Sequence, residues 1–398
     1  MEMRDVPSLR DRLADALSGH TADYLEIRVE ETDATTLTYR GRSLEEAGRT
    51  SNLGGCVRAC VKGGWGFVSF NSLEGLRAKV DLAVRQARLV GRETTTLAPV
   101  EPHVDFIIPA LVRDPLTVSL EDKKRLMDEY VEAAWAQSSR IQTTNAGYGD
   151  ARRKVTFINS EGSYLEQSRC RVSARVVVLA RDGGNVQQSR AVFSSTSDYD
   201  AIVGRHAEVG AAASRAVALL DAAPAPGGEF TVICDPALAG VFAHEAFGPL
   251  SEGDNVYENE RLRDIMVLGK RFGRPLLNIA DGGVVGGQPG TFRYDDEGTP
   301  TQRTDLIREG VLVGRLHSRE TAGKMGEAAT GNARAQSYRH APLVRMTNTF
   351  IGAGDSSFDE MVAATPLGIF CRDWYGGQTT HEQFSFGCAE AWMIRDGK

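Results

Sequence analysis

Apolar residues near the start of the chain recur every three or four positions, which is the spacing of one helix face. Leucines follow this pattern over residues 9–17, and Gly19 stands where a helix would end. Over residues 23–29 the pattern changes to strict alternation, with Glu26 and Arg28 on the polar face. Alternation with period two is typical of a strand that buries one face. The sequence therefore predicts a short helix followed by a half-buried strand.

The rest of the first half continues with strand and helix patterns. Residues 54–70 resemble two paired strands that turn at residues 62–64. Two longer amphipathic helices are predicted at 73–89 and 120–135, and several strand-like runs follow over 139–195. We therefore expect an α+β arrangement, in which an antiparallel sheet is covered by helices.

An Ala-, Pro- and Gly-rich segment at residues 222–228 follows a predicted helix at 207–220. Such a segment is typical of a domain boundary. We predict an N-terminal α+β domain over residues 1–225 and a C-terminal β-rich domain over residues 226–398. The second domain has many glycine turns, and its clearest helices are predicted at 237–247 and 319–325.

Composition narrows the possible functions. The 46 basic and 53 acidic residues give a net charge of −7, and no basic stretch offsets it, which argues against nucleic-acid binding. No apolar run approaches the ~18 residues that span a bilayer, and the charged N-terminus lacks a signal-peptide core. We expect a cytoplasmic protein with six reduced cysteines. The Gly-rich segment 281–290 lacks the lysine of a phosphate-binding loop, so no nucleotide cofactor is expected.

The most informative run spans residues 230–254, where a strand leads into a helix with Asp235 as its predicted cap. This helix carries His244 and Glu245 near its end. A His-Glu pair on a helix is the centre of zinc peptidase motifs, in which His binds the metal and Glu handles the proton of a water. The usual second histidine, four residues on, is replaced by Gly248.

Several further segments share their order and residues with one known family: 22–30, 63–71, 331–351, 354–361 and 376–398. Together with the helix, they make the chain resemble the TldD/PmbA family of modulator-of-gyrase metallopeptidases, whose catalytic members carry H-E-x-x-x-H. The resemblance implies His244 as a zinc ligand, Glu245 as the general base and Cys388 as the cysteine ligand. Pro249 stands where the family has its second ligand histidine, so the implied zinc site is incomplete.

Five positions of a regular helix turn about 500°, so ligands at that spacing need a break, and Gly248 is the natural place for it. Pro249 suits the break but offers no metal ligand. Other side chains could complete the site instead; the candidates are Glu252, Asp254, His340 and His381.

A second group of residues could hold a peptide. Glycines before a strand allow another backbone to approach closely, and the family resemblance implies that an unfolded peptide is added as a strand. The residues expected to contact substrate are Gly376, Gly377, Gln378, Arg345, Asn348 and Thr349.

Three functions remain open. The first is a hydrolase that acts on peptides or on an amide-bearing, peptide-derived small molecule, for example in natural-product maturation. The second is a catalytically silent or reassigned subunit of a two-subunit TldD/PmbA complex; the family resemblance implies a homodimer or a heterodimer with a paralogue. The third is a metal-independent enzyme that uses Glu245 as base and His244 as acid.

Overall fold

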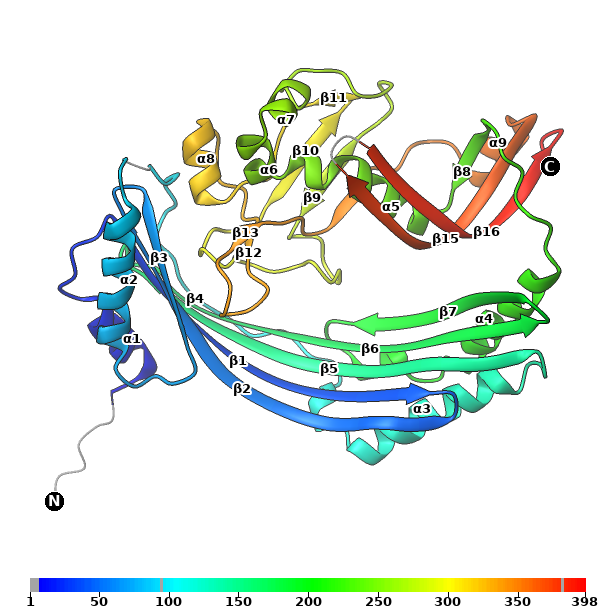
Figure 1. The fold of residues 1–398 in the computed structure, drawn as a ribbon, viewed down its shortest axis with the longest axis horizontal. Helices are drawn as coiled ribbons and strands as arrows, with labels where there is room; N and C mark the ends of the chain where they lie inside the picture. Colours follow the sequence, from blue (N-terminus) through cyan, green and yellow to red (C-terminus); the bar gives the residue numbers. More distant parts are fainter. Residues whose placement is uncertain (1–6, 94–95, 381–382) are drawn as a thin grey trace.

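The computed structural model describes residues 7–93, 96–380 and 383–398. A long curved sheet forms one half of the molecule, and the C-terminal half faces its concave side (Figure 1). Helices and strands are both abundant, and the large sheet is mainly antiparallel. The α+β prediction is confirmed.

The large sheet has seven strands in the order β3-β2-β1-β5-β6-β4, with β7 added beside β6. All neighbours are antiparallel except β4 and β6. The β2–β3 hairpin turns through Lys62 and Gly63, as predicted. The strand bounds are β1 (Tyr24–Arg40), β2 (Ser43–Val61), β3 (Gly64–Phe70), β4 (Val104–Ile107), β5 (Ile141–Asn159), β6 (Tyr164–Asp182) and β7 (Asn185–Ser195).

Two pairs of helices cover this sheet and enclose two apolar cores. At one end α1 (Leu9–Leu17) and α2 (Leu76–Val90) bury Leu13 and Val80. At the other end α3 (Leu120–Trp135) and α4 (His206–Ala218) bury Tyr130. Helix α3 has the predicted bounds, because a regular apolar period and a Ser119 cap agree. Short 3-10 turns lie at Pro115–Thr117, Tyr199–Ile202 and Leu219–Asp221.

The C-terminal half contains three small sheets, in the orders β11-β10-β9-β14, β12-β13 and β16-β15-β8. Helices α6, α7 and α9 were not predicted, because six residues are too few to show a helical period. The bounds are β8 (Thr231–Cys234), α5 (Pro236–Phe247), a 3-10 turn (Pro249–Ser251), α6 (Gly253–Glu258), α7 (Glu260–Ile265), β9 (Ile279–Gly282), β10 (Arg303–Arg308), β11 (Val311–Leu312), α8 (Arg319–Met325), β12 (Ala333–Arg334), β13 (Leu343–Val344), β14 (Thr349–Ile351), α9 (Phe358–Ala363), β15 (Leu367–Thr380) and β16 (Gln383–Arg395).

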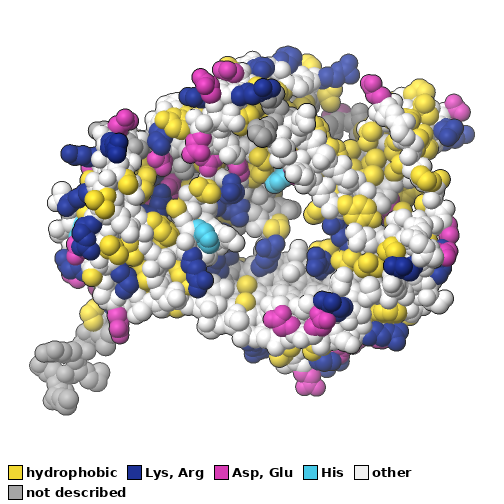
Figure 2. Space-filling view, viewed as in Figure 1, with side chains coloured by type: hydrophobic (Ala, Val, Ile, Leu, Met, Phe, Trp, Pro, Cys, Tyr) yellow, Lys and Arg dark blue, Asp and Glu magenta, His cyan; other side chains and the backbone are white. Residues whose placement is uncertain are grey.

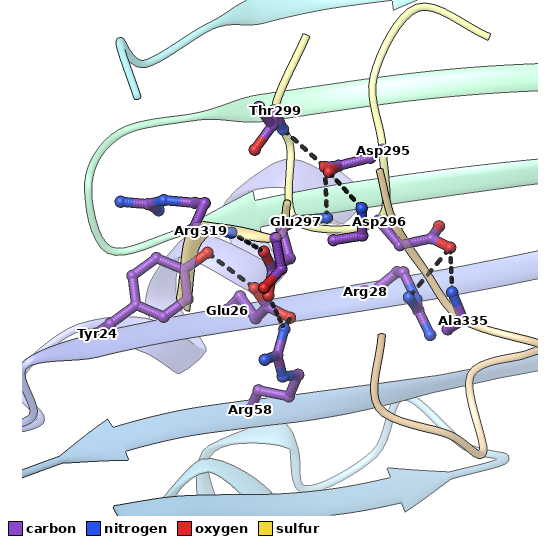
Figure 3. Close-up of polar contacts among 12 residues, drawn as sticks. Tyr24, Glu26, Arg28, Arg58, Asp295, Asp296, Glu297, Thr299, Arg319 and Ala335 are labelled. Atoms are coloured by element: carbon purple, nitrogen blue, oxygen red, sulfur yellow. Dashed lines mark hydrogen bonds and ion pairs between the residues drawn. The ribbon is translucent and has the colours of Figure 1, made fainter. Parts of the chain in front are cut away.

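The two halves meet through a buried network of charged groups (Figure 3). Arg58 Nη1 lies 3.0 Å from Glu26 Oε1 and 2.9 Å from Glu297 Oε1, and Tyr24 also donates to Glu26. Burying a charge is costly unless it is paired and hydrogen-bonded, and here each carboxylate has a cation. The prediction of a half-buried strand is therefore wrong at this end of β1, where both faces are buried. Glu26 and Arg28 are about 1% exposed because their face of β1 packs on the C-terminal half.

A second contact joins the halves at the other end of the sheet. Arg190 of β7 lies 4.0 Å from the ring centre of Trp374 and 3.1 Å from Asp373 Oδ1. Arg215 of α4 also lies 3.2 Å from Glu390. Between the two contacts the space-filling view shows an opening with Lys and Arg side chains on its margin (Figure 2).

Candidate functional site

Helix α5 begins and ends where its sequence indicates. Asp235 caps its start by accepting a 2.8 Å hydrogen bond from the Leu238 N–H, and Pro236 occupies the first turn. Gly248 ends the helix, and a Cβ at this position would lie only 2.0 Å from Met346 Sδ. Pro249 then opens a 3-10 turn. The predicted break at Gly248 is thus present, and the backbone there touches the neighbouring chain segment.

One face of α5 lines a cleft with a volume of about 700 Å³. His244 is exposed on its wall, whereas Glu245 is only 8% exposed. The opposite wall comes from the segment before and within β14 and from β15. The lining residues are Ala237, Gly240, Val241, His244, Glu245, Arg334, Arg345, Met346, Thr347, Thr349, Trp374, Gly376 and Gly377.

The Glu245 carboxylate is held from β15. Thr379 Oγ1 lies 2.7 Å from Glu245 Oε2 and 2.7 Å from its backbone oxygen, so the hydroxyl donates to this residue. Gly377 lets the carboxylate lie directly on the strand, since a Cβ there would come within 2.4 Å of Glu245 Oε1. The carboxylate therefore has a fixed position at the cleft, one residue along α5 from the exposed His244. Such a pair can move a proton at the cleft wall.

The Cys388 thiol lies against Cys371, which pairs with Cys234 just before the start of α5. Cys388 lies opposite Trp374 in the β15–β16 pairing, and its thiol contacts Cys371, next to Cys234. Burial and this contact raise the pKa of Cys371 to about 12. Cys234 directly precedes Asp235, whereas His244 lies on the last turn, roughly 13 Å further along the axis. Cys388 and His244 therefore stay predicted ligands, and the described residues place no third His, Cys, Asp or Glu with them in a metal-binding group.

The possible substitute ligands are engaged elsewhere. Glu252 lies 3.2 Å from Arg345 Nη1, and Asp254 Oδ2 accepts from the Val344 N–H. His340 lines a separate cavity, and His381 lies outside the described residues. Over residues 7–93, 96–380 and 383–398, no group of three or more His, Cys, Asp or Glu side chains is arranged to hold a metal ion.

The predicted substrate residues divide into two groups. Gly376, Gly377, Arg345 and Thr349 line the cleft. Gln378 instead lines a shallow hollow of about 410 Å³ beside it, on the β15–β16 hairpin. Asn348 does not line the cleft, because its amide donates to Gly282 O and accepts from the Gly290 N–H.

Sequence reasoning missed seven cleft residues: Ala237, Gly240 and Val241 on α5, and Arg334, Met346, Thr347 and Trp374 on the opposite wall. Strand alternation could have indicated one of them, Thr347. Residues 345, 347 and 349 share a face of an extended segment, whereas 348 points the other way. The hydroxyls of Thr347 and Thr349 both donate to the buried Asp281, which fixes this wall. Nothing in the local pattern around Arg334 or Trp374 indicates the cleft.

A His-Glu pair on a helix that lines a cleft is a feature of metallopeptidases. Comparison with known proteins identifies the family: the chain belongs to the PmbA/TldA metallopeptidase family. The models of its first, central and C-terminal domains match residues 25–87, 113–220 and 227–398.

Relatives of this family match over most of the chain. A metalloprotease of Synechocystis sp. is 43% identical over 95% of this chain and 82% of its own length. A metalloprotease of Methanocaldococcus jannaschii is 35% identical over 94% of this chain and 84% of its own. Among solved structures, TldE from Thermococcus kodakarensis shares the fold, with a TM-score of 0.73 and 17% identity over 98% of this chain and 88% of its own.

The relatives' name implies a metal, but the described residues do not provide a complete ligand set. A catalytic zinc usually has three protein ligands. Here His244 is followed by Pro249, which has no donor side chain, and Cys388 is turned towards Cys371. In the part of the chain that the structure describes, no helix is both long and apolar enough to cross a membrane.

Proposed function

We propose that this protein is a TldD-type hydrolase that binds a peptide, or a peptide-derived amide, in extended form along the cleft beside α5. The observation that carries the proposal is the His244–Glu245 pair, exposed on one side and anchored by Thr379 on the other. Glu245 accepts a proton from the attacking water, and His244 donates one to the departing amine. Gly376 and Gly377 line the cleft without side chains, which lets a peptide backbone approach β15.

The test is hydrolysis of an unfolded protein and of short fluorogenic peptides by the full-length chain. Glu245→Gln should lower the rate at least a hundredfold, because it removes the proton acceptor but keeps the shape. Glu258→Gln is the matched control, since Glu258 is exposed and does not line the cleft. Metal content of the purified protein, and rates with and without added zinc, show whether the hydrolysis depends on metal. Equal rates for native protein and Glu245→Gln would contradict the proposal.

A second candidate is a silent or reassigned subunit of a two-subunit complex. Pro249 favours it, because the family's second histidine is absent, and the fold likeness to TldE is consistent with it. This subunit would bind peptide without cutting it and act beside a catalytic paralogue. Size analysis of the chain, alone and mixed with a TldD-type paralogue, separates a homodimer from a heterodimer.

The variant Pro249→His links the two candidates. If the present site is a modified peptidase site, the new imidazole should raise zinc binding and peptide hydrolysis together. If the variant gains neither, residue 249 alone does not determine whether the protein binds zinc and cuts peptides.

A further inference from the structure

Two arginines form a wall shared by two cavities. The cleft of about 700 Å³ is separated from a neighbouring cavity of about 400 Å³ by Arg334 and Arg345, which line both. His244 lines the first cavity and His340 lines the second. Among the described residues that line either cavity, Glu245 is the one carboxylate. The wall therefore carries a surplus of positive charge opposite the reacting pair.

The local fold explains why these arginines face the same way. Strands β12 and β13 are antiparallel, with Arg334 opposite Leu343, and the Arg345 N–H donates to Asn332 O at 2.9 Å. Side chains alternate between faces along a strand, so Arg334 and Arg345 share a face as diagonal neighbours. Diagonal neighbours on such a ribbon are about 7–8 Å apart, a spacing that two guanidinium groups can bridge to one anion.

Arg334 is a cation without a direct carboxylate partner in the described chain. Its Nη1 donates to Met346 O at 2.5 Å, and its guanidinium lies 5.5 Å from the ring centre of Phe292. Burial lowers the pKa of Arg334, although Asp296 and Asp281 oppose this effect from a distance. The backbone contact and the ring hold the group in place, while its charge lacks a close counter-ion.

Arg345 supplies the second half of the wall. Its side chain is 50% exposed, and Nη1 makes its contacts with Glu252 and with Val344 O. Within the described residues, the hydrogen bonds of this side chain all use Nη1, so Nε and Nη2 remain available to a ligand. Guanidinium groups bind carboxylates with paired, charge-assisted hydrogen bonds.

We propose that Arg334 and Arg345 form a carboxylate-binding subsite, so the preferred substrates are peptides that place a carboxylate next to the bond facing His244 and Glu245. The proposal rests on the proposed peptide-binding function and deepens it by naming the substrate class. The carboxylate belongs either to the C-terminus of the peptide or to an Asp or Glu side chain.

Binding of three labelled peptides to the full chain tests this subsite. The peptides share one neutral sequence and differ in one feature: a free C-terminal carboxylate, a C-terminal amide, or a C-terminal amide with one internal Glu. Fluorescence anisotropy gives each Kd, and mass spectrometry checks that the peptides stay intact. The variants are Arg334→Gln and Arg345→Gln, and Arg339→Gln is the control because Arg339 is exposed and lines neither cavity.

At least one carboxylate peptide should bind native protein tenfold or more tighter than the neutral amide. The preference should fall below threefold in Arg334→Gln and Arg345→Gln and persist in Arg339→Gln. The peptide that binds native protein more tightly than the neutral amide, the one with a free C-terminus or the one with an internal Glu, identifies the source of the carboxylate. Arg334→Lys keeps a charge at this half-buried position, and partial retention of the preference there excludes a mere folding defect. Raising NaCl should weaken the carboxylate peptides more than the amide.

Three results would overturn the subsite. If native protein binds all three peptides equally, peptide binding stands and the carboxylate subsite falls. If Arg339→Gln loses the preference as fully as Arg334→Gln, the effect comes from general charge. If no peptide binds native protein at all, the proposed function itself fails, and the subsite fails with it.

Discussion

Gly377→Ala places one methyl group directly against the Glu245 carboxylate. The added Cβ would lie 2.4 Å from Oε1, 2.5 Å from Cγ and 2.7 Å from Cδ of Glu245. All three distances are well below van der Waals contact, so the carboxylate must move away from β15. Because Thr379 holds the same carboxylate at 2.7 Å, the movement also breaks that hydrogen bond.

The size of the effect follows from these contacts. Inserting a methyl group into a packed position costs about 1–3 kcal/mol. For a chain of this length that corresponds to a Tm lower by roughly 1–4 °C. A displacement of about 1 Å in a reacting group costs up to about a hundredfold in rate. Thermal unfolding and peptide hydrolysis of the same preparation measure both effects.

Gly387→Ala is the matched control on the facing strand. It carries the same change, but a Cβ at Gly387 would meet nothing within 4 Å. Its Tm and rate should therefore equal or slightly exceed those of native protein. If Gly377→Ala and Gly387→Ala behave alike in both measurements, Glu245 is not held by contact with β15, and the description of the site is wrong.

Three further predictions concern single side chains. Burial, with a contribution from Asp254, raises the pKa of Glu252 to about 7 against the attraction of Arg345. The folded state therefore keeps a proton that the unfolded chain loses near its ordinary pKa of 4.5, so the free energy of unfolding should fall by roughly 3 kcal/mol as pH rises from 4 to 8. Glu252→Gln should remove this fall in urea unfolding at the two pH values, and an unchanged fall would refute the assignment. Arg58→Met leaves Glu26 and Glu297 without their shared cation, so it should lower the free energy of unfolding by about 3–5 kcal/mol. Arg42→Met is the control: Arg42 belongs to an exposed ion pair, and its loss should change the free energy of unfolding by less than about 0.5 kcal/mol. Thr379→Val should lower kcat about tenfold with little change in KM, and Thr379→Ser should restore it, because the Glu245 carboxylate loses and then regains one donor.

Local signals determined which elements could be predicted from the sequence. Helices α3 and α8 have the predicted bounds, because apolar spacing and a serine cap agree at each. The end of α5 at Gly248 was equally visible in the chain. The burial of Glu26 and Arg28 could not be predicted, because alternation shows that a strand has two faces but does not show what covers the polar face.

The candidate site also combines residues that the local sequence indicates with residues that only the tertiary structure brings in. His244 and Glu245 are adjacent in sequence, and both reach the cleft. Thr379 and Gly377, which hold Glu245, lie more than 130 residues further along the chain, and no periodic pattern links them to α5. The exclusion of Asn348 also depends on tertiary structure, because its amide is taken by the loop at residues 282–291.

The charged contact between the two halves has a consequence for the chain while it is being made. The large sheet can be complete once Ser195 has been synthesised, but Glu297 pairs with Arg58 across 239 positions. Until that partner arrives, the face of β1 with Glu26 and Arg28 is open to water. An exposed apolar face of this size would promote aggregation or misfolding of a nascent chain. The charged side chains of Glu26 and Arg28 instead keep this face of the sheet hydrated until the C-terminal half packs on it. The same side chains thus limit aggregation early in synthesis and form the specific contact between the two halves afterwards.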